Sequence, residues 1–153
     1  MPKSLLFALL GAAASALLIA SISWLADDLF VTESYWTCEE ARAEDFFKRG
    51  WMPDVLPKSC GPVASAQDLD INSVCASATM PAGEVQFVQD SLMELGFGKL
   101  AGALDELPFR DRCPFSLDDI STTDLKFSRA SESLLRTEFF VVSPGGRVFY
   151  WTS

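Results

Sequence analysis

The sequence has 153 residues, of which 49% are hydrophobic and 22% are charged, and its formal net charge is −9. This acidic balance argues against nucleic acid or anionic lipid as a partner and favours a solvated surface or a basic partner. The absence of histidine excludes the usual catalytic triads, the commonest general base and most catalytic zinc sites.

An uncharged apolar run of 23 residues occupies positions 4–26. At a rise of ~1.5 Å per residue, a helix of this length covers ~34 Å, which is enough to cross the hydrocarbon core of a bilayer. Lys3 precedes the run and Asp27 follows it, so the positive-inside rule places the N-terminus in the cytoplasm. We therefore expect residues 1–26 to be a transmembrane signal-anchor and the rest of the chain to be exported. The alternative is a signal peptide whose cleavage leaves a soluble exported protein.

Residues 27–153 have the length of one small periplasmic domain, for which the sequence predicts an α+β fold. Thr37 and Glu40 have the spacing of a capping box, and Gly50 stands where a left-handed helix stop belongs. These signals predict a first helix from Cys38 to Arg49. The following segment, 51–67, is rich in proline and glycine and is expected to form a loop or a set of turns.

The middle of the chain changes from an alternating to a helical pattern. Residues 70–80 alternate between polar and apolar side chains, which predicts a strand with Ile71 turned inward. A second helix is expected to end at Gly96, because an apolar stripe precedes it at helical spacing. A short third helix is expected between residues 100 and 107. The stripe of the second helix consists of Val85, Val88, Leu92 and Leu95.

The C-terminal segment, 137–153, has two β-branched and aromatic runs on either side of Ser143–Gly146. Pro144 at position i+1 and Gly145 at i+2 predict a type II turn, so the runs are expected to pair as an antiparallel hairpin. Residues 125–129 are expected to add a strand before it. Both faces of the hairpin are apolar, which predicts helices on one side and another covering element on the other.

The four cysteines, Cys38, Cys60, Cys75 and Cys113, all follow the apolar run. An even number in an oxidising compartment predicts two disulfides, and four cysteines allow three pairings. We favour Cys60 with Cys75 and Cys38 with Cys113. No CxxC sequence is present, so a thioredoxin-like redox role has no support.

Oxygen-bearing side chains at alternate positions, Asp68, Asp70 and Asn72, open a pattern that resembles a calcium loop. Ser73 stands where such a loop needs glycine, and Thr79 where it needs a bidentate glutamate. We therefore expect a turn in which these side chains accept backbone hydrogen bonds, with no metal or other cofactor.

Three aromatic residues, Trp51, Tyr150 and Trp151, are candidates for a partner surface, because such side chains combine a large contact area with a polar group. We favour core packing for them, since a small domain needs large buried apolar groups. Asp118 and its acidic neighbours Asp119 and Asp124 fit a solvated loop better than a catalytic site.

Three segments resemble a group of uncharacterised small proteobacterial proteins that are membrane-anchored or exported: GWMPDVLPKS at 50–59, DLDINS at 68–73 and GGRVFYW at 145–151. The resemblance implies a bacterial envelope protein with no assigned activity. Our hypothesis is a non-catalytic binding or accessory module that is anchored in the bacterial inner membrane through residues 4–26. Its exported domain is expected to face the periplasm and to bind an envelope protein partner. The alternatives are a subunit of a larger inner-membrane complex and a periplasmic enzyme that uses aspartates or a metal.

Overall fold

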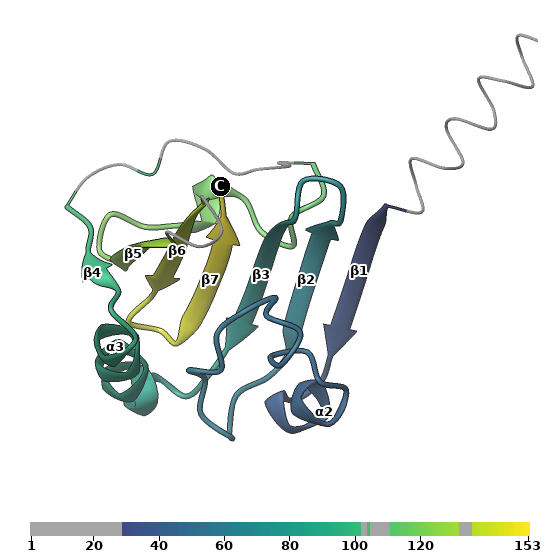
Figure 1. The fold of residues 1–153 in the computed structure, drawn as a ribbon. Coiled ribbons are helices and arrows are strands. Elements are labelled where there is room, and N and C mark those ends of the chain that lie inside the picture. Colours follow the sequence, from purple (N-terminus) through teal and green to yellow (C-terminus); the bar gives the residue numbers. More distant parts are fainter. Residues whose placement is uncertain (1–28, 102–103, 105–110, 132–135) are drawn as a thin grey trace, which may run out of the picture.

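The computed structural model describes residues 29–101, 104, 111–131 and 136–153. Within these residues, seven strands form one antiparallel sheet in the order β1-β2-β3-β7-β6-β5-β4 (Figure 1). The strands are β1 (Phe30–Tyr35), β2 (Val63–Asp68), β3 (Ser73–Thr79), β4 (Gly98–Lys99), β5 (Leu125–Ser131), β6 (Arg136–Val142) and β7 (Arg147–Thr152). The helices are α2 (Cys38–Ala43) and α3 (Val85–Glu94), with 3-10 turns at Ala82–Glu84 and Leu117–Asp119. The predicted combination of strands and helices is thus confirmed in coarse form, as a mostly antiparallel sheet with few helices.

Two meanders meet at the centre of the sheet. One consists of β1, β2 and β3, and the other runs from β4 through β7. They join where β3 pairs with β7, in a register that sets Cys75 opposite Trp151 and Ala78 opposite Val148. Strands far apart in the sequence therefore share one hydrogen-bonded ladder.

Both faces of the sheet are buried, as the apolar C-terminal runs predict. On the first face, Phe140, Val142 and Tyr150 pack with residues of α2, α3 and the loop between α2 and β2. On the second face, Trp151 packs with Phe115 and other residues of the connection before β5. Side chains alternate between the two faces along each strand, so each half of the core uses every second residue of the same strands.

The C-terminal hairpin is confirmed as β6 and β7, but the predicted type II turn is wrong. The positive φ falls on Gly146, at 85°, and Gly145 is not among the residues with positive φ. The Gly146 carbonyl accepts a 2.8 Å hydrogen bond from the Met80 N–H. A β-carbon on Gly146 would overlap the Met80 carbonyl oxygen, so this position needs glycine for two reasons.

The first helix begins where predicted and ends earlier. The Thr37 hydroxyl accepts from the Glu40 N–H at 3.1 Å, which confirms the N-cap. The helix stops at Ala43 because Asp45 adopts a left-handed conformation with φ of 58°. The resulting reversal turns Phe46 into the core, where its ring meets Tyr35 edge-on at 5.6 Å.

Three further expectations have mixed outcomes. The second helix is confirmed as α3, and Gly96 has the expected positive φ of 85°. The predicted strand at 70–80 is β3, but Ile71 precedes it and is 59% exposed. Most of the predicted third helix, between 100 and 107, lies outside the described residues, and β4 ends just before it.

The proline-rich segment contains more order than expected. Its last residues form β2, which pairs with β1 on one side and β3 on the other. The prolines and Gly61 all precede Val63, so they do not interrupt the hydrogen-bonded ladder. β1, which the sequence analysis did not predict, completes this edge of the sheet.

The favoured disulfide pairing is wrong. The structure joins Cys38 to Cys60 and Cys75 to Cys113, with Cα–Cα distances of 5.3 and 5.6 Å. The hairpin register excludes the expected pair, because Cys75 lies opposite Ala66. Cys60 lies six residues before Ala66, or ~20 Å along an extended strand, which is far beyond the reach of a disulfide.

Within the described residues, no helix has the length and apolar character that crossing a bilayer requires. The predicted anchor at 4–26 lies outside them.

The hairpin geometry predicts different effects for two neighbouring glycines. Replacing Gly146 with alanine is expected to lower the free energy of unfolding by more than ~2 kcal/mol, because it combines a left-handed strain with an overlap. Gly145→Ala is the matched control, since its β-carbon would meet only the Ser143 hydroxyl at 3.9 Å. Denaturant unfolding of the full chain in mild detergent measures both. Equal losses for the two variants would contradict the turn geometry.

The observed disulfides predict a specific peptide map. Digestion without reduction is expected to release Cys38 linked to Cys60 and Cys75 linked to Cys113. The enclosed segments, with separations of 22 and 38 residues, correspond to ~3 and ~4 kcal/mol of stabilisation in the chain-entropy model. A Cys60–Cys75 peptide from the native protein would contradict the β2–β3 register as well as the pairing.

Candidate functional site

The aspartates of the suspected calcium loop form the β2–β3 turn. Asp68 Oδ1 accepts hydrogen bonds from the N–H groups of Asp70 at 3.0 Å and Ile71 at 3.4 Å. Asn72 completes the turn in a left-handed conformation with φ of 50°, a conformation that asparagine tolerates well. The expected turn is therefore confirmed. In the part of the chain that the structure describes, no three His, Cys, Asp or Glu side chains are grouped to hold a metal ion.

The acidic residues after Phe115 also serve local structure. Asp119 Oδ2 accepts from the Ser116 N–H at 2.7 Å and closes a capping box over the 3-10 turn, while Asp118 is exposed. Asp124 Oδ2 accepts from the Ser121 N–H at 2.8 Å. These carboxylates satisfy backbone groups of the connection that covers the second face of the sheet.

The three candidate surface aromatics have different positions. Tyr150 is 0% exposed on the first face of the sheet, and Trp151 is 1% exposed on the second. The hypothesis of a partner surface is therefore wrong for these two, because adjacent strand residues point into opposite halves of the core. Trp51 is half-buried and lines a surface hollow.

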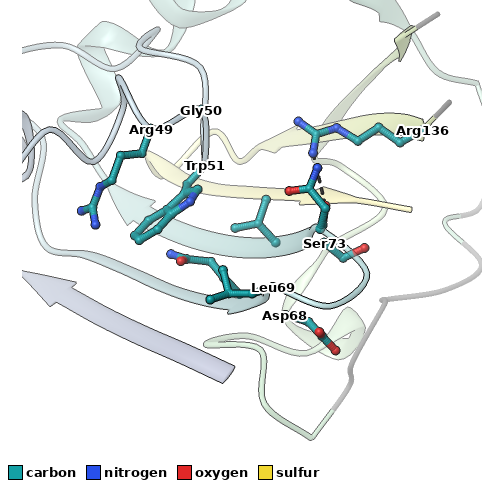
Figure 2. Close-up of a pocket in the computed structure, with 10 residues that line it drawn as sticks. Arg49, Gly50, Trp51, Asp68, Leu69, Ser73 and Arg136 are labelled. Carbon is teal, nitrogen blue, oxygen red and sulfur yellow. Dashed lines mark hydrogen bonds between the residues drawn. The ribbon is translucent and has the colours of Figure 1, made fainter. Parts of the chain in front are cut away.

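The hollow has a volume of about 240 Å³ and lies between the loop that follows α2, the β2–β3 turn and the start of β6. Figure 2 shows Trp51 and Arg136 on opposite sides of it, with Asp68 directed away. We call it the Trp51 hollow. It is lined by Arg49, Gly50, Trp51, Gln67, Asp68, Leu69, Asn72, Ser73, Val74 and Arg136.

The Trp51 wall is held by a stack of contacts. The Arg49 guanidinium lies 3.8 Å from the centre of the Trp51 ring, a distance at which a cation is attracted to the ring face. Arg49 in turn donates to both Glu33 oxygens, at 3.0 and 2.9 Å, and to the Tyr35 hydroxyl at 3.2 Å. Burial and then the neighbouring Glu33 carboxylate raise the pKa of Tyr35, which keeps its hydroxyl protonated. This wall is therefore fixed before any ligand arrives.

The floor of the hollow contains a buried amide. Gln67 is 2% exposed, and its Nε2 donates to the Ser65 hydroxyl at 3.0 Å. Its Oε1 has no hydrogen-bond partner among the described residues. A buried acceptor without a partner costs about 1–3 kcal/mol, so folded proteins retain few of them.

Arg136 supplies a matching donor. Its Nη1 donates to the Asn72 carbonyl at 3.2 Å, and its Nη2 lies 3.5 Å from Glu138 Oε1. Its Nε is buried and, within the described part of the chain, has no partner. Two residues of the hollow lining, Gln67 and Arg136, thus each carry a buried polar atom without a partner in the described residues.

Within the described residues, Arg136 shares its carboxylate partner with a second arginine. Glu138 is 4% exposed, and its Oε2 accepts a 2.9 Å hydrogen bond from Arg129 Nε. The two arginines therefore share one buried carboxylate. Burial, followed by the nearby Glu138 charge, raises the pKa of Tyr150 on the same face, so its hydroxyl stays neutral.

A second hollow, of about 230 Å³, lies against the second face of the sheet and is bordered by Phe115 and Phe149. Of the buried polar atoms that lack a partner in the described residues, none belongs to its lining. The Trp51 hollow is the better candidate because two residues of its lining carry such atoms.

Comparison with known proteins bears on this site. Residues 30–77 match the family model of the YbbD head domain. The matched segment runs from β1 into β3 and contains every lining residue of the Trp51 hollow except Arg136. Searches of curated proteins and of solved structures found no match. Together with two disulfides, which require an oxidising compartment, the similarity supports an envelope-associated protein.

Sequence reasoning did not single out Gln67 or Arg136. Each is an ordinary polar residue at the end of a strand, and they are 69 positions apart. Their relation depends on the order of the strands, for which the sequence has no short-range signal. Of the lining residues, Trp51 was proposed for a partner surface, and Asp68 and Asn72 were weighed as calcium ligands and assigned to a turn.

The unpartnered amide predicts an unusual response to substitution. Gln67→Met keeps the side-chain length and removes both the unpartnered acceptor and the Nε2 hydrogen bond to Ser65. Because these two effects oppose each other, the free energy of unfolding is expected to change by less than ~1 kcal/mol. Gln86→Met, on the exposed side of α3, is the matched control. Chemical unfolding of the full chain in mild detergent measures both. A loss above ~1 kcal/mol for Gln67→Met alone would mean that the amide serves the fold.

Proposed function

We propose that the protein is a membrane-anchored, periplasmic binding module whose recognition site is the Trp51 hollow. The observation that carries this proposal is that two residues of the hollow lining, Gln67 and Arg136, each carry a buried polar atom without a partner in the described residues. Polar atoms of this kind destabilise a fold unless another molecule satisfies them. A binding role explains why they are present.

The geometry limits the chemistry of the ligand. Gln67 Oε1 requires a hydrogen-bond donor and Arg136 Nε requires an acceptor, while Trp51 offers an amphipathic ring. A ligand therefore needs an N–H or O–H group for Gln67 and a hydrogen-bond acceptor for Arg136. The volume of about 240 Å³ suits one side chain or one small polar group of a larger partner.

The arrangement supports binding over catalysis. Three of the aspartates that the sequence offered for acid–base chemistry, Asp68, Asp119 and Asp124, accept backbone hydrogen bonds in turns. Asp70 and Asp118 are exposed. Arg136 and Gln67 are groups that orient a ligand, and neither is a ready proton acceptor near neutral pH. A non-catalytic accessory module in the envelope fits these side chains best.

The membrane part of the proposal rests on residues 4–26, whose 23 uncharged positions have the length of a membrane span. The N-terminus would then lie in the cytoplasm and the disulfide-bonded domain in the periplasm. Such a module holds its partner at a fixed distance from the inner membrane.

The test is affinity capture from carbonate-washed membranes with the tagged full chain. We expect the intact chain to stay in the membranes and, after extraction in mild detergent, to retain a partner. Gln67→Met is expected to reduce the captured partner at least tenfold, because one lost hydrogen bond in a buried site corresponds to ~1.4 kcal/mol or more. Gln86→Met is the control and is expected to capture as much as the wild type.

Two outcomes would overturn the proposal. Release of the chain from the membranes with a trimmed N-terminus would refute the anchor. Equal capture by Gln67→Met and the wild type would refute the Trp51 hollow as the recognition site.

A further inference from the structure

Exposed aliphatic side chains gather at the end of the sheet where the described chain begins. Leu29, Leu69 and Ile71 are 43%, 50% and 59% exposed. The Leu69 N–H donates to the Leu29 carbonyl at 2.9 Å, so the β2–β3 turn lies directly beside the start of β1 (Figure 1). We call these three residues the apolar tip. Turns of this kind usually carry small polar residues at such positions.

The chain that precedes the apolar tip limits where the tip can lie. The predicted anchor ends at Ala26, and only Asp27 and Asp28 separate it from Leu29. Three residue steps extend at most ~11 Å. The headgroup layer of one leaflet is roughly 5–8 Å thick, so Leu29 and its neighbour Leu69 must lie within or just outside that layer.

We infer that the apolar tip rests in the headgroup layer of the membrane that holds residues 4–26. This inference depends on the proposed anchor and adds an orientation to it. The sheet stands with its β2–β3 end on the bilayer, and α3 lies at the far end. Contact with the bilayer explains why Leu69 and Ile71 project from a turn that the described residues leave exposed.

Charge determines which lipid surface fits. Asp68 and Asp70 flank Leu69 in the turn, and Asp70 is exposed. Carboxylates at this position are repelled by anionic headgroups and tolerated by zwitterionic ones. The occupant is therefore a zwitterionic bilayer surface, and an anionic surface weakens the contact.

The test places the full chain in phosphatidylcholine nanodiscs that contain a small fraction of lipid with a gadolinium chelate on its headgroup. Amide paramagnetic relaxation is measured at Leu69 and Ile71 and compared with that at Gly83. Gly83 lies beyond the far end of β3, whose seven residues span about 20 Å. We expect relaxation at the tip to exceed that at Gly83 more than tenfold, and the ratio to fall when anionic phosphatidylglycerol is added.

Matched variants separate the apolar contact from the tether alone. Leu69→Ser combined with Ile71→Ser is expected to reduce the relaxation at the tip at least threefold. Phe87→Ser, which changes a residue 56% exposed on α3, is expected to leave it unchanged. Since all three side chains are on the surface, each variant is expected to fold.

The outcomes are distinguishable from failure of the proposed function. If the chain stays in carbonate-washed membranes and relaxation is uniform along the domain, the anchor holds and the orientation is wrong. If the tip signals respond to protein concentration and not to the lipid probe, the tip binds a second copy and the inference is wrong. If the carbonate wash releases the chain from the membranes, both the proposed anchor and the proposed orientation are wrong.

Discussion

The pairing of β3 with β7 is the contact on which the rest of the fold depends. It joins a meander from the N-terminal half to one from the C-terminal half, with Cys75 opposite Trp151. Because the ladder fixes which side chains share a face, it also sets the composition of both halves of the core. The two disulfides then secure segments that pack onto opposite faces, through Cys38 on the first face and Cys75 on the second. Non-local pairing of this kind has to close a long loop before its contacts form, which costs chain entropy. Each disulfide reduces the entropy of the unfolded chain by keeping its two cysteines together.

Elements with strong local signals could be predicted from the sequence. The C-terminal hairpin has β-branched and aromatic runs around a turn, and α3 has an apolar stripe between a proline and a glycine. β2 was missed because the prolines before Val63 dominate its surroundings. The disulfide pairing was wrong because it depends on the β2–β3 register, which sets Cys75 opposite Ala66. The Trp51 hollow could not be predicted, since its lining includes Gln67 on β2 and Arg136 on β6, with β3 and β7 between them in the final sheet.

The first face of the sheet changes character from one end to the other. Near α3 it is apolar, with Val88 and Leu92 over Phe140, whereas near the β2–β3 turn it carries Gln67, Arg136 and Glu138. A buried carboxylate between two arginines is tolerated because hydrogen bonds satisfy its oxygens. The same end leaves one donor and one acceptor unpartnered in the described residues. The helical end is thus mostly apolar, and the opposite end carries the buried polar groups.

Leu69 belongs both to the lining of the Trp51 hollow and to the apolar tip. If the apolar tip rests on the bilayer, the Trp51 hollow opens within one strand length of the headgroups. A ligand of the hollow must then be present near the membrane surface. A soluble partner would then have to approach along the membrane surface, whereas a partner that is itself held in the membrane loses less translational freedom on binding. The shared residue also couples the two contacts, because a movement of the β2–β3 turn away from lipid changes one wall of the hollow. Membrane contact and ligand binding are therefore expected to be thermodynamically linked, each strengthening or weakening the other by the same factor.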